Sequence, residues 1–479
     1  MTKPDQAERG SVSSLVDQPE KIWSLSTTDI YAIDIEETKA FQLDALRKRF
    51  DKLVPNIPMV SKLAAEHGVT RIDDLADAAP LLLKHSVYKS YPLSAIEKGQ
   101  FDRMTRWLNN LTTHDISGLN TDGVDTIDDW IDALDSNTPI RVRHSSGTSG
   151  KLSFLPASTA EDARALPTWR TFFEGYGDEP DAEISGLSEA PMVFASYRYG
   201  AMAQHRRMNA LQHTLFNDNP DMIVTLNKGR LSADALSLGG RLAAAADKGE
   251  LGDIALSPKL RERREEYLRA QAQSGQDVKA FFETLPERLG GRRIQLLGSV
   301  GQLYDMAVAG LANGMEGVFA PDSLIVMGGG SKGREMPEGW HETICRFLGV
   351  PDIRDGYGMT EMSMSMRSCP HGHYHMPPVY VLFILDSKTG EQQPRTGVQE
   401  GRLGFYDLTR TDLWGGFLTG DAVTLHWGDI TPCACGRRGA YLTKSIRRYS
   451  QEEGGDDKIT CAGAPQAHDN ALTFLNNLV

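Results

Sequence analysis

The 479-residue sequence predicts an α/β fold in which a parallel sheet carries helices on both faces. Short apolar runs at 191–196, 294–298 and 324–327 have the length and composition of buried strands. Segments with helical periodicity separate these runs, and strands that alternate with helices are typical of a parallel sheet. Apolar residues make up 40% of the chain and charged residues 24%, so we expect a sizeable packed core.

The chain begins with a polar stretch and continues with helices. Residues 1–35 are rich in polar residues and show little periodicity, so we expect them to be disordered or loosely docked. Apolar residues at helical spacing predict helices over 41–53, 59–67, 72–79, 101–108, 127–134, 160–173 and 340–348.

Two further helices are predicted from their end signals. Ser257 and Pro258 are residues favoured at an N-cap and at the first helical position, so they predict a helix start. Gly275 predicts the end of that helix. Asp277 is then expected to cap a following helix that runs through Leu289.

The strand at 191–196 opens into the polar and aromatic turn Tyr-Arg-Tyr-Gly. In α/β proteins ligands bind beyond the ends of the strands. We therefore take Tyr197 and Gly200, together with Ser299 after the strand at 294–298, as candidates for the wall of a substrate pocket.

Charge and hydropathy exclude several classes of partner. The net charge of −13 argues against a nucleic acid or an anionic membrane as the main partner. No apolar run approaches the length of a membrane span, and the first residues show no signal peptide, so we expect a cytoplasmic protein. Five cysteines in a chain of this length do not form a disulfide framework.

Residues 143–153, Arg-His-Ser-Ser-Gly-Thr-Ser-Gly-Lys-Leu-Ser, have the composition of a phosphate-binding loop. Small residues leave backbone N–H groups open to a ligand, and Lys151 adds a positive charge. The stretch is not a Walker loop, because its glycines are too close and Leu152 follows the lysine. A flexible Ser/Gly linker is the alternative interpretation. The candidate ligand-binding positions are Ser145, Ser146, Gly147, Thr148, Ser149 and Gly150.

A glycine cluster follows the strand at 324–327. Residues 328–333 match Gly-x-Gly-x-x-Gly, and Asp352 lies about twenty residues further on, as a dinucleotide-binding fingerprint requires. We reject that interpretation because the next helix begins only near Pro337, so the glycines do not open a helix. A plain turn at the strand end remains the alternative to a ligand-binding role for Gly328, Gly329 and Gly330.

Cysteines and histidines cluster in two short segments, 369–375 and 433–437. Cys369, Cys433 and Cys435 with one histidine would make a Cys₃His set for structural zinc. His375 is our preferred fourth ligand and His371 the second choice. Free buried thiols or solvent-facing histidines are the alternative.

Three stretches of the sequence resemble the signatures of adenylate-forming enzymes, in the branch that holds phenylacetate–coenzyme A ligases and the luminescence acyl-protein synthetases. The loop at 143–153 resembles Ser-Ser-Gly-Thr-Thr-Gly-Lys-Pro, with Ser149 and Leu152 as departures. Residues 353–361 contain Tyr-Gly-Met-Thr-Glu, which matches Tyr-Gly-x-Thr-Glu at every fixed position. Residues 401–421 contain Gly-Arg-Leu-Gly and then Thr-Gly-Asp. The resemblance covers roughly residues 40–460.

The resemblance implies a role for each matched residue. Glu361 can hold Mg²⁺ on triphosphate oxygens, and Thr360 can hydrogen-bond a phosphate. Tyr357, with Asp355 and Gly356 before it, can pack on adenine, and the glycines from Gly328 form a wall of the adenine and acyl pocket. Asp421 would accept the ribose hydroxyls. Relatives with similar Cys-x-Cys elements bind zinc in some cases, which supports the zinc interpretation.

The resemblance also implies a fold and a division of the chain. We expect the large N-terminal domain of adenylate-forming enzymes over 36–455, with parallel sheets and a small β subdomain. Residues 456–479 would be a hinge-like remnant with a short helix at 471–478, so the usual small C-terminal domain is expected to be missing or rudimentary. Arg448 is the candidate hinge arginine that reaches ribose, and Cys461 is a candidate acyl acceptor.

These observations predict an enzyme that uses ATP and Mg²⁺ to convert a small carboxylic acid to an acyl-adenylate. The acyl group would then pass to coenzyme A, a carrier-protein or enzyme thiol, or an amine, so an acyl-accepting protein is a candidate partner. One alternative is a non-catalytic nucleotide- or acyl-binding relative. A weaker one is a dinucleotide oxidoreductase built on residues 328–333.

Overall fold

The computed structural model describes residues 12–145, 151–174, 184–249, 258–328, 335–449 and 464–476. The candidate residues Ser146–Gly150, Gly329, Gly330 and Cys461 and the expected hinge at 455–459 lie outside these ranges. The chain divides into two compact units. Unit 1 takes in residues up to Lys84, Leu111–Thr113 and Cys369–Tyr449, and unit 2 takes in His85–Asn110, His114–Ser368 and the residues after Tyr449.

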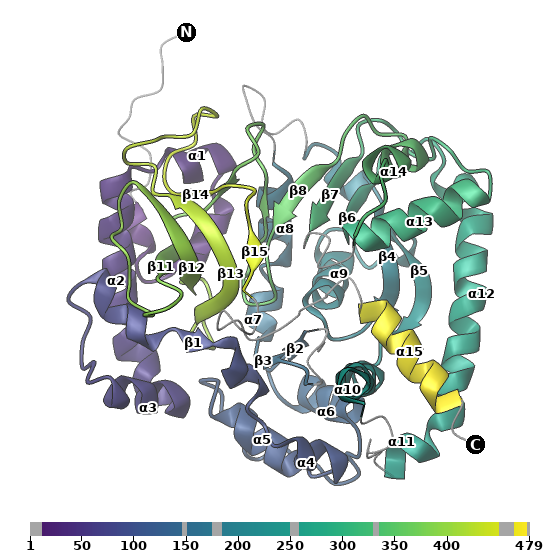
Figure 1. The fold of residues 1–479 in the computed structure, drawn as a ribbon, viewed down its shortest axis with the longest axis horizontal. Coiled ribbons are helices and arrows are strands. Elements are labelled where there is room, and N and C mark those ends of the chain that lie inside the picture. Colours follow the sequence, from purple (N-terminus) through teal and green to yellow (C-terminus); the bar gives the residue numbers. More distant parts are fainter. Residues whose placement is uncertain are drawn as a thin grey trace. The chain divides into compact units, whose positions relative to one another are not determined.

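Unit 2 contains a largely parallel sheet in the order β5-β4-β6-β7-β8-β9, in which only β9 runs antiparallel to its neighbour (Figure 1). The strands are β4 (Met192–Tyr199), β5 (Ile223–Arg230), β6 (Gln295–Ser299), β7 (Leu324–Gly328), β8 (Arg354–Tyr357) and β9 (Met366–Arg367). A hairpin pairs β2 (Arg143–His144) with β3 (Phe154–Leu155).

Helices cover both faces of this sheet. Side chains of one face, such as Val193 and Leu296, pack with α12, α13 and α14, and those of the other face, such as Phe194 and Val326, pack with α8 and α9. This arrangement confirms the predicted α/β fold class. The α-helices of unit 2 are α4 (Leu93–Glu97), α5 (Phe101–Asn109), α6 (Ile127–Asn137), α7 (Thr159–Asp162), α8 (Ala165–Phe173), α9 (Ala203–Thr214), α10 (Ala233–Lys248), α11 (Pro258–Glu262), α12 (Arg264–Leu289), α13 (Val300–Ala312), α14 (Trp340–Leu348) and α15 (Ala464–Asn476).

Unit 1 is built on an antiparallel sheet in the order β10-β14-β13-β12-β11, with β1 and β15 also paired to β13. Its strands are β1 (Leu83–Lys84), β10 (Tyr374–His375), β11 (Tyr380–Leu385), β12 (Val398–Asp407), β13 (Gly416–His426), β14 (Tyr441–Leu442) and β15 (Arg447–Arg448). Its α-helices are α1 (Thr27–Ala32), α2 (Ile35–Leu53) and α3 (Pro58–Glu66). Buried Arg49 of α2 joins helix to sheet by donating hydrogen bonds to the carbonyls of Leu413 and Trp414.

Residues 12–35 differ from the disordered or loosely docked segment that their polarity predicts. They contain two short 3₁₀ helices and α1, and Ile22, Trp23 and Ile30 are at most 3% exposed. Burial of these apolar side chains offsets the entropy lost on ordering the segment.

The predicted helix end at Gly275 and cap at Asp277 are wrong, because α12 runs unbroken through both residues. Buried Asp277 instead accepts hydrogen bonds from the backbone N–H of Lys228, at 3.1 Å, and from Nε2 of Gln273, at 3.0 Å. Phe281 and Leu285 of the same helix enter the core. Tertiary packing here overrides the preference of glycine for a helix end.

Substitution of Gly239 on α10, with Gly275 on α12 as the control, tests how tightly α15 packs on α10. A Cβ on Gly239 would lie 2.2 Å from the carbonyl oxygen of Ala467, whereas one on Gly275 would meet nothing within 4 Å. Gly239→Ala should therefore lower the free energy of unfolding by about 1–3 kcal/mol through overpacking. The control Gly275→Ala should raise it by about 0.5–1 kcal/mol, because alanine favours a helix interior. Chemical denaturation measures both, and a neutral Gly239→Ala would contradict the close contact.

Candidate functional site

The carboxyl ends of β6, β7 and β8 bring three candidate residues into one row. Ser299 is paired in register with Gly328, and Gly328 is paired with Gly356. This edge is where open α/β sheets bind ligands. Ser299 is also the N-cap of α13, where its Oγ accepts a hydrogen bond from the N–H of Gln302 at 3.3 Å. The backbone at this edge is therefore fixed by strand pairing and by a helix cap.

The Tyr-Gly-Met-Thr-Glu turn follows the row directly. Tyr357 ends β8 and is 8% exposed, while Thr360 and Glu361 are half-buried. A Cβ on Gly358 would lie 2.2 Å from Oγ of Ser365, so only glycine fits where the two sides of the turn meet. The turn thus carries a hydroxyl and a carboxylate in a tightly closed loop next to the sheet edge.

The loop after β2 is pinned at its base. The N–H of Ser145 donates to the carbonyl of Ser153 at 3.1 Å, and the N–H of Ser153 donates to Oγ of Ser145 at 3.0 Å. These reciprocal bonds close the loop where the β2–β3 hairpin ends. The two described ends of the stretch are therefore fixed relative to each other.

Lys151 is held beside Tyr91, which the sequence did not indicate. Its Nζ donates to the carbonyls of Tyr91, at 2.9 Å, and Lys89, at 3.4 Å, and lies 5.1 Å from the centre of the Tyr91 ring. The hydroxyl of Tyr91 donates to the carbonyl of Leu152 at 3.0 Å. Burial lowers the pKa of Lys151. The carbonyls offer partial negative charge and no carboxylate, so the ammonium retains its attraction for a stronger anion.

Tyr197 and Gly200 are engaged with protein groups. The hydroxyl of Tyr197 donates to Oδ1 of Asp469 on α15 at 3.0 Å, and burial raises its pKa. Gly200 has φ +152°, and a Cβ there would lie 2.8 Å from Nδ1 of His205. Both residues thus have structural partners at the end of β4.

Asp421 and Arg448 form an ion pair in unit 1. They are opposite each other in the β13–β15 ladder, and Nε of Arg448 lies 2.9 Å from Oδ1 of Asp421. Asp421 is 5% exposed. The structure therefore brings together the two residues that the sequence assigned to ribose.

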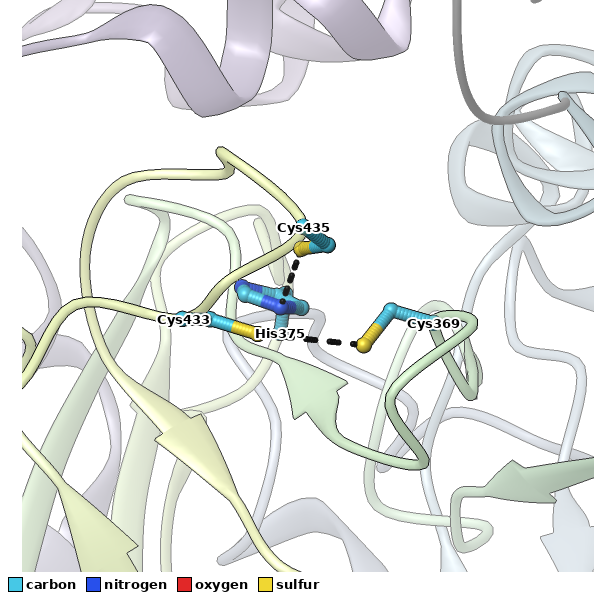
Figure 2. Close-up of side chains that lie close together, drawn as sticks. All are labelled: Cys369, His375, Cys433 and Cys435. Carbon is cyan, nitrogen blue, oxygen red and sulfur yellow. Dashed lines mark hydrogen bonds between the residues drawn. The ribbon is translucent and has the colours of Figure 1, made fainter.

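The predicted metal ligands come together as a compact group in unit 1 (Figure 2). The ligand atoms of Cys369, His375, Cys433 and Cys435 all lie within 4.8 Å of one another. Sγ of Cys435 lies 3.1 Å from Nε2 of His375, and the sulfurs of Cys369 and Cys433 are 3.9 Å apart. The group contains His375, the preferred fourth ligand, and not His371.

The electrostatics of the group favour a thiolate. Hydrogen bonding from the thiol of Cys435 lowers the pKa of Cys369 to about 2, with a further contribution from His375. The hydrogen bond to Cys369, together with burial, raises the pKa of Cys435. The neighbours of Cys369 thus favour its ionised form, and the thiolate is the form of cysteine that binds a metal ion.

The sequence did not identify the outer contacts of this group. Nδ1 of His373 lies 3.2 Å from Sγ of Cys433, and the His373 ring stacks on Tyr441 with centroids 4.7 Å apart. The hydroxyl of Tyr31 donates to the carbonyl of His375 at 3.1 Å. The three closely spaced histidines at 371–375 were the only signal for a second imidazole near the sulfurs.

Among the helices in the described parts of the chain, none is both long and apolar enough to span a membrane.

No protein-family model matches the sequence, and no curated protein matches it. Among solved structures the chain is similar to a 2-hydroxyisobutyryl-CoA ligase in complex with R3-HIB-AMP, at 13% identity and a TM-score of 0.44 over 86% of this chain and 68% of that one. It is also similar to a long-chain-fatty-acid-CoA ligase from Archaeoglobus fulgidus, at 11% identity and a TM-score of 0.36 over 65% and 52%.

ATP-bound MatB from Rhodopseudomonas palustris is similar at 12% identity, with a TM-score of 0.30 over 63% of this chain and 46% of that one. The chain thus spans about half the length of the last two proteins. Since every one of these TM-scores is below 0.5, function has to be inferred from the residues of this chain.

Proposed function

We propose that the protein uses ATP to convert a small carboxylic acid to an acyl-adenylate. One observation carries this proposal: the row of Ser299, Gly328 and Gly356 at the carboxyl edge of the sheet leads directly into the turn that carries Thr360 and Glu361. Backbone that is free of bulky side chains, followed at once by a hydroxyl and a carboxylate, suits a nucleotide whose phosphates need hydrogen bonds and a metal ligand.

In the proposed reaction a carboxylate oxygen of the acid attacks the α-phosphorus of ATP. The bond from that phosphorus to the bridging oxygen breaks, and pyrophosphate leaves with its electron pair. Glu361 would hold the Mg²⁺ that screens the phosphate charges. Lys151 would exchange its carbonyl partners for the leaving pyrophosphate, whose charge it neutralises. Asp421 would accept hydrogen bonds from the ribose hydroxyls once Arg448 releases one of its oxygens.

We further propose that the Cys₃His group holds a structural zinc ion. Three thiols and one imidazole within 4.8 Å match the closed tetrahedral sites that zinc prefers. With four protein ligands the ion would have no position for water or substrate, so it would tie together the segments around Cys369 and Cys433 without entering the reaction.

The acyl acceptor is the least constrained part of the proposal. Coenzyme A, a carrier-protein thiol, an amine and the thiol of Cys461 all fit an activated acyl group chemically. Transfer to Cys461 would add one acyl mass to the chain, labile to hydroxylamine and lost in Cys461→Ser. Intact-mass spectra that show no adduct during steady production of coenzyme A thioester would exclude that route.

The proposed reaction is tested by pyrophosphate release from ATP and Mg²⁺ with a panel of aliphatic and aromatic carboxylic acids. Release that depends on one class of acid supports it and identifies the substrate. Nucleotide binding without release for any acid favours the non-catalytic relative. Binding of a nicotinamide dinucleotide would instead favour the oxidoreductase.

A further inference from the structure

A buried imidazole beside the carboxyl end of β4 has no hydrogen-bond partner. His205 lies in the first turn of α9 and is 0% exposed. Neither of its ring nitrogens has a partner among the residues that the structure describes. The ring packs edge-to-face against Phe194, with the two centroids 5.7 Å apart. Burial of a polar group without a hydrogen bond is costly, so this imidazole is poised to gain a partner.

Nδ1 of His205 faces the backbone of Gly200. A Cβ on Gly200 would lie 2.8 Å from this nitrogen, so the space that a side chain would occupy is filled by the imidazole. Gly200 itself is only half-buried, and the backbone that covers the nitrogen is therefore partly open to solvent. Glycine changes its backbone conformation more readily than any other residue. A shift of this one residue would bring Nδ1 to the surface.

The imidazole lies where two segments assigned to ligands meet. The N–H of His144 donates to the carbonyl of Ala201 at 3.0 Å, which joins the end of β2 to the turn after β4. His144 directly precedes Ser145, whose hydrogen bonds fix the base of the candidate phosphate loop. Gly200, next to Ala201, is a candidate for the wall of the acid pocket. In the proposed reaction the carboxylate has to lie between the phosphates and that pocket, which is at this junction.

His205 is neutral, and its charged neighbours are cations. Burial, with smaller contributions from His144, Arg198 and Arg206, lowers the pKa of His205 to about 3. The backbone of Tyr197 acts weakly in the opposite direction. Near neutral pH the ring therefore has one N–H donor and one acceptor nitrogen.

The charge of Arg198 is not compensated by a carboxylate among the described residues. Its guanidinium donates to the amide oxygens of Asn209, at 2.7 Å, and of Gln212, which are both neutral. Arg206, in contrast, forms an ion pair with Asp135. Arg198 thus gives the surroundings of His205 a positive potential, which favours an anionic ligand.

We propose that Nδ1 of His205 donates a hydrogen bond to the reacting carboxylate of the acid once the backbone of Gly200 has moved aside. This inference rests on the function proposed above. A neutral donor orients the carboxylate and leaves its charge available for attack on phosphorus, whereas a cation would also stabilise the ground state strongly. Such hydrogen bonds are often poorly formed in a ligand-free enzyme and tighten only in the substrate complex.

The test measures pyrophosphate release by variants of the full chain, with acetate, octanoate and benzoate as probes. His205→Phe keeps the packing on Phe194 and removes the donor. With the acid that gives the highest wild-type rate, it should lower kcat/KM for the acid by about 10- to 100-fold and leave the KM for ATP unchanged. His205→Asn places an amide N–H near the position of Nδ1 and should recover part of this loss. His205→Gln places its amide near Nε2 and should not.

The order of the variants separates hydrogen bonding from packing. Packing alone predicts that His205→Asn, which leaves a gap in the core, is both less stable and less active than His205→Phe. The proposal predicts that His205→Asn is the more active of the two, whatever their order of stability in chemical denaturation. His213→Phe is the control on the same helix. His213 is exposed and lies 3.0 Å from Asp218, so its replacement should leave the kinetics unchanged.

The outcomes distinguish this inference from the proposed function. A wild-type kcat/KM for the acid in His205→Phe would overturn the inference alone. A higher KM for ATP with an unchanged KM for the acid would place the imidazole at the phosphates and would overturn it as well. Absence of release by the wild type with all three acids would count against the proposed function, and the inference would be lost with it.

Discussion

Replacement of Lys151 or Glu361 by alanine should slow pyrophosphate release by roughly 10²–10³-fold, the usual effect of removing one electrostatic contact to developing charge. Lys151 is held near its loop by carbonyls alone, so its loss removes charge without breaking an ion pair among the described residues. Glu361 is half-buried in a turn, and its loss removes the proposed metal ligand. Release is measured with a coupled pyrophosphate assay at saturating ATP.

The matched controls are Lys279→Ala and Glu283→Ala. These residues form an exposed pair on α12, 3.7 Å apart, and a surface pair of this kind contributes little to stability. Both controls should keep wild-type release and wild-type unfolding curves. Unchanged turnover in Lys151→Ala and Glu361→Ala would mean that the loop and the turn do not hold ATP, whatever else the protein binds.

The second large effect is expected at the Cys₃His group. The purified protein should contain about one zinc ion per chain. Cys433→Ser or Cys435→Ser should remove it and lower the free energy of unfolding by about 4 kcal/mol or more, the range of a lost metal site. Zinc binds a site that exists only in the folded chain, so its binding energy becomes folding energy. Elemental analysis and thermal unfolding measure the two effects.

Cys345→Ser is the control for thiol loss alone. Cys345 is half-buried on α14 in unit 2, with its sulfur 3.7 Å from Nδ1 of His341. Its replacement should leave the zinc content unchanged and change stability far less. Metal-free protein prepared without chelator, with the same stability in Cys433→Ser as in the wild type, would refute the zinc proposal.

The parts of the fold that follow from local pattern could be predicted from the sequence. The strand expected at 324–327 is β7, Leu324–Gly328, and the helix expected at 340–348 is α14. Both depend on the spacing of apolar residues, which neighbouring elements do not change. The Cys₃His group could be predicted because soft thiols and imidazoles that cluster in sequence are typical of metal sites.

The rest depended on contacts between distant residues. The hydroxyl of Tyr197 donates to Asp469, which is 272 positions away, and no local pattern predicts that contact. From the sequence, Gly275 predicts a helix end, but α12 continues through it. The core side chains of the helix and the hydrogen bond accepted by Asp277 stabilise the continuous helix. Ile22 and Ile30 lie in a polar stretch, and only the folded unit supplies the surface that buries them. At these positions the free energy of tertiary packing outweighs the local conformational preference of the sequence.

The spacing of the four proposed metal ligands has a consequence for the order of folding. Cys369 and Cys433 are 64 positions apart, and Cys435 is 60 positions from His375. Closing so long a loop has a large entropic barrier, and here β10 and β14 are paired beside the ligands. We therefore expect these four side chains to meet once the two strands have found their register. A metal ion would then bind late in folding and stabilise a topology that has already formed. The rate at which refolding protein takes up the ion would therefore measure the rate at which unit 1 assembles.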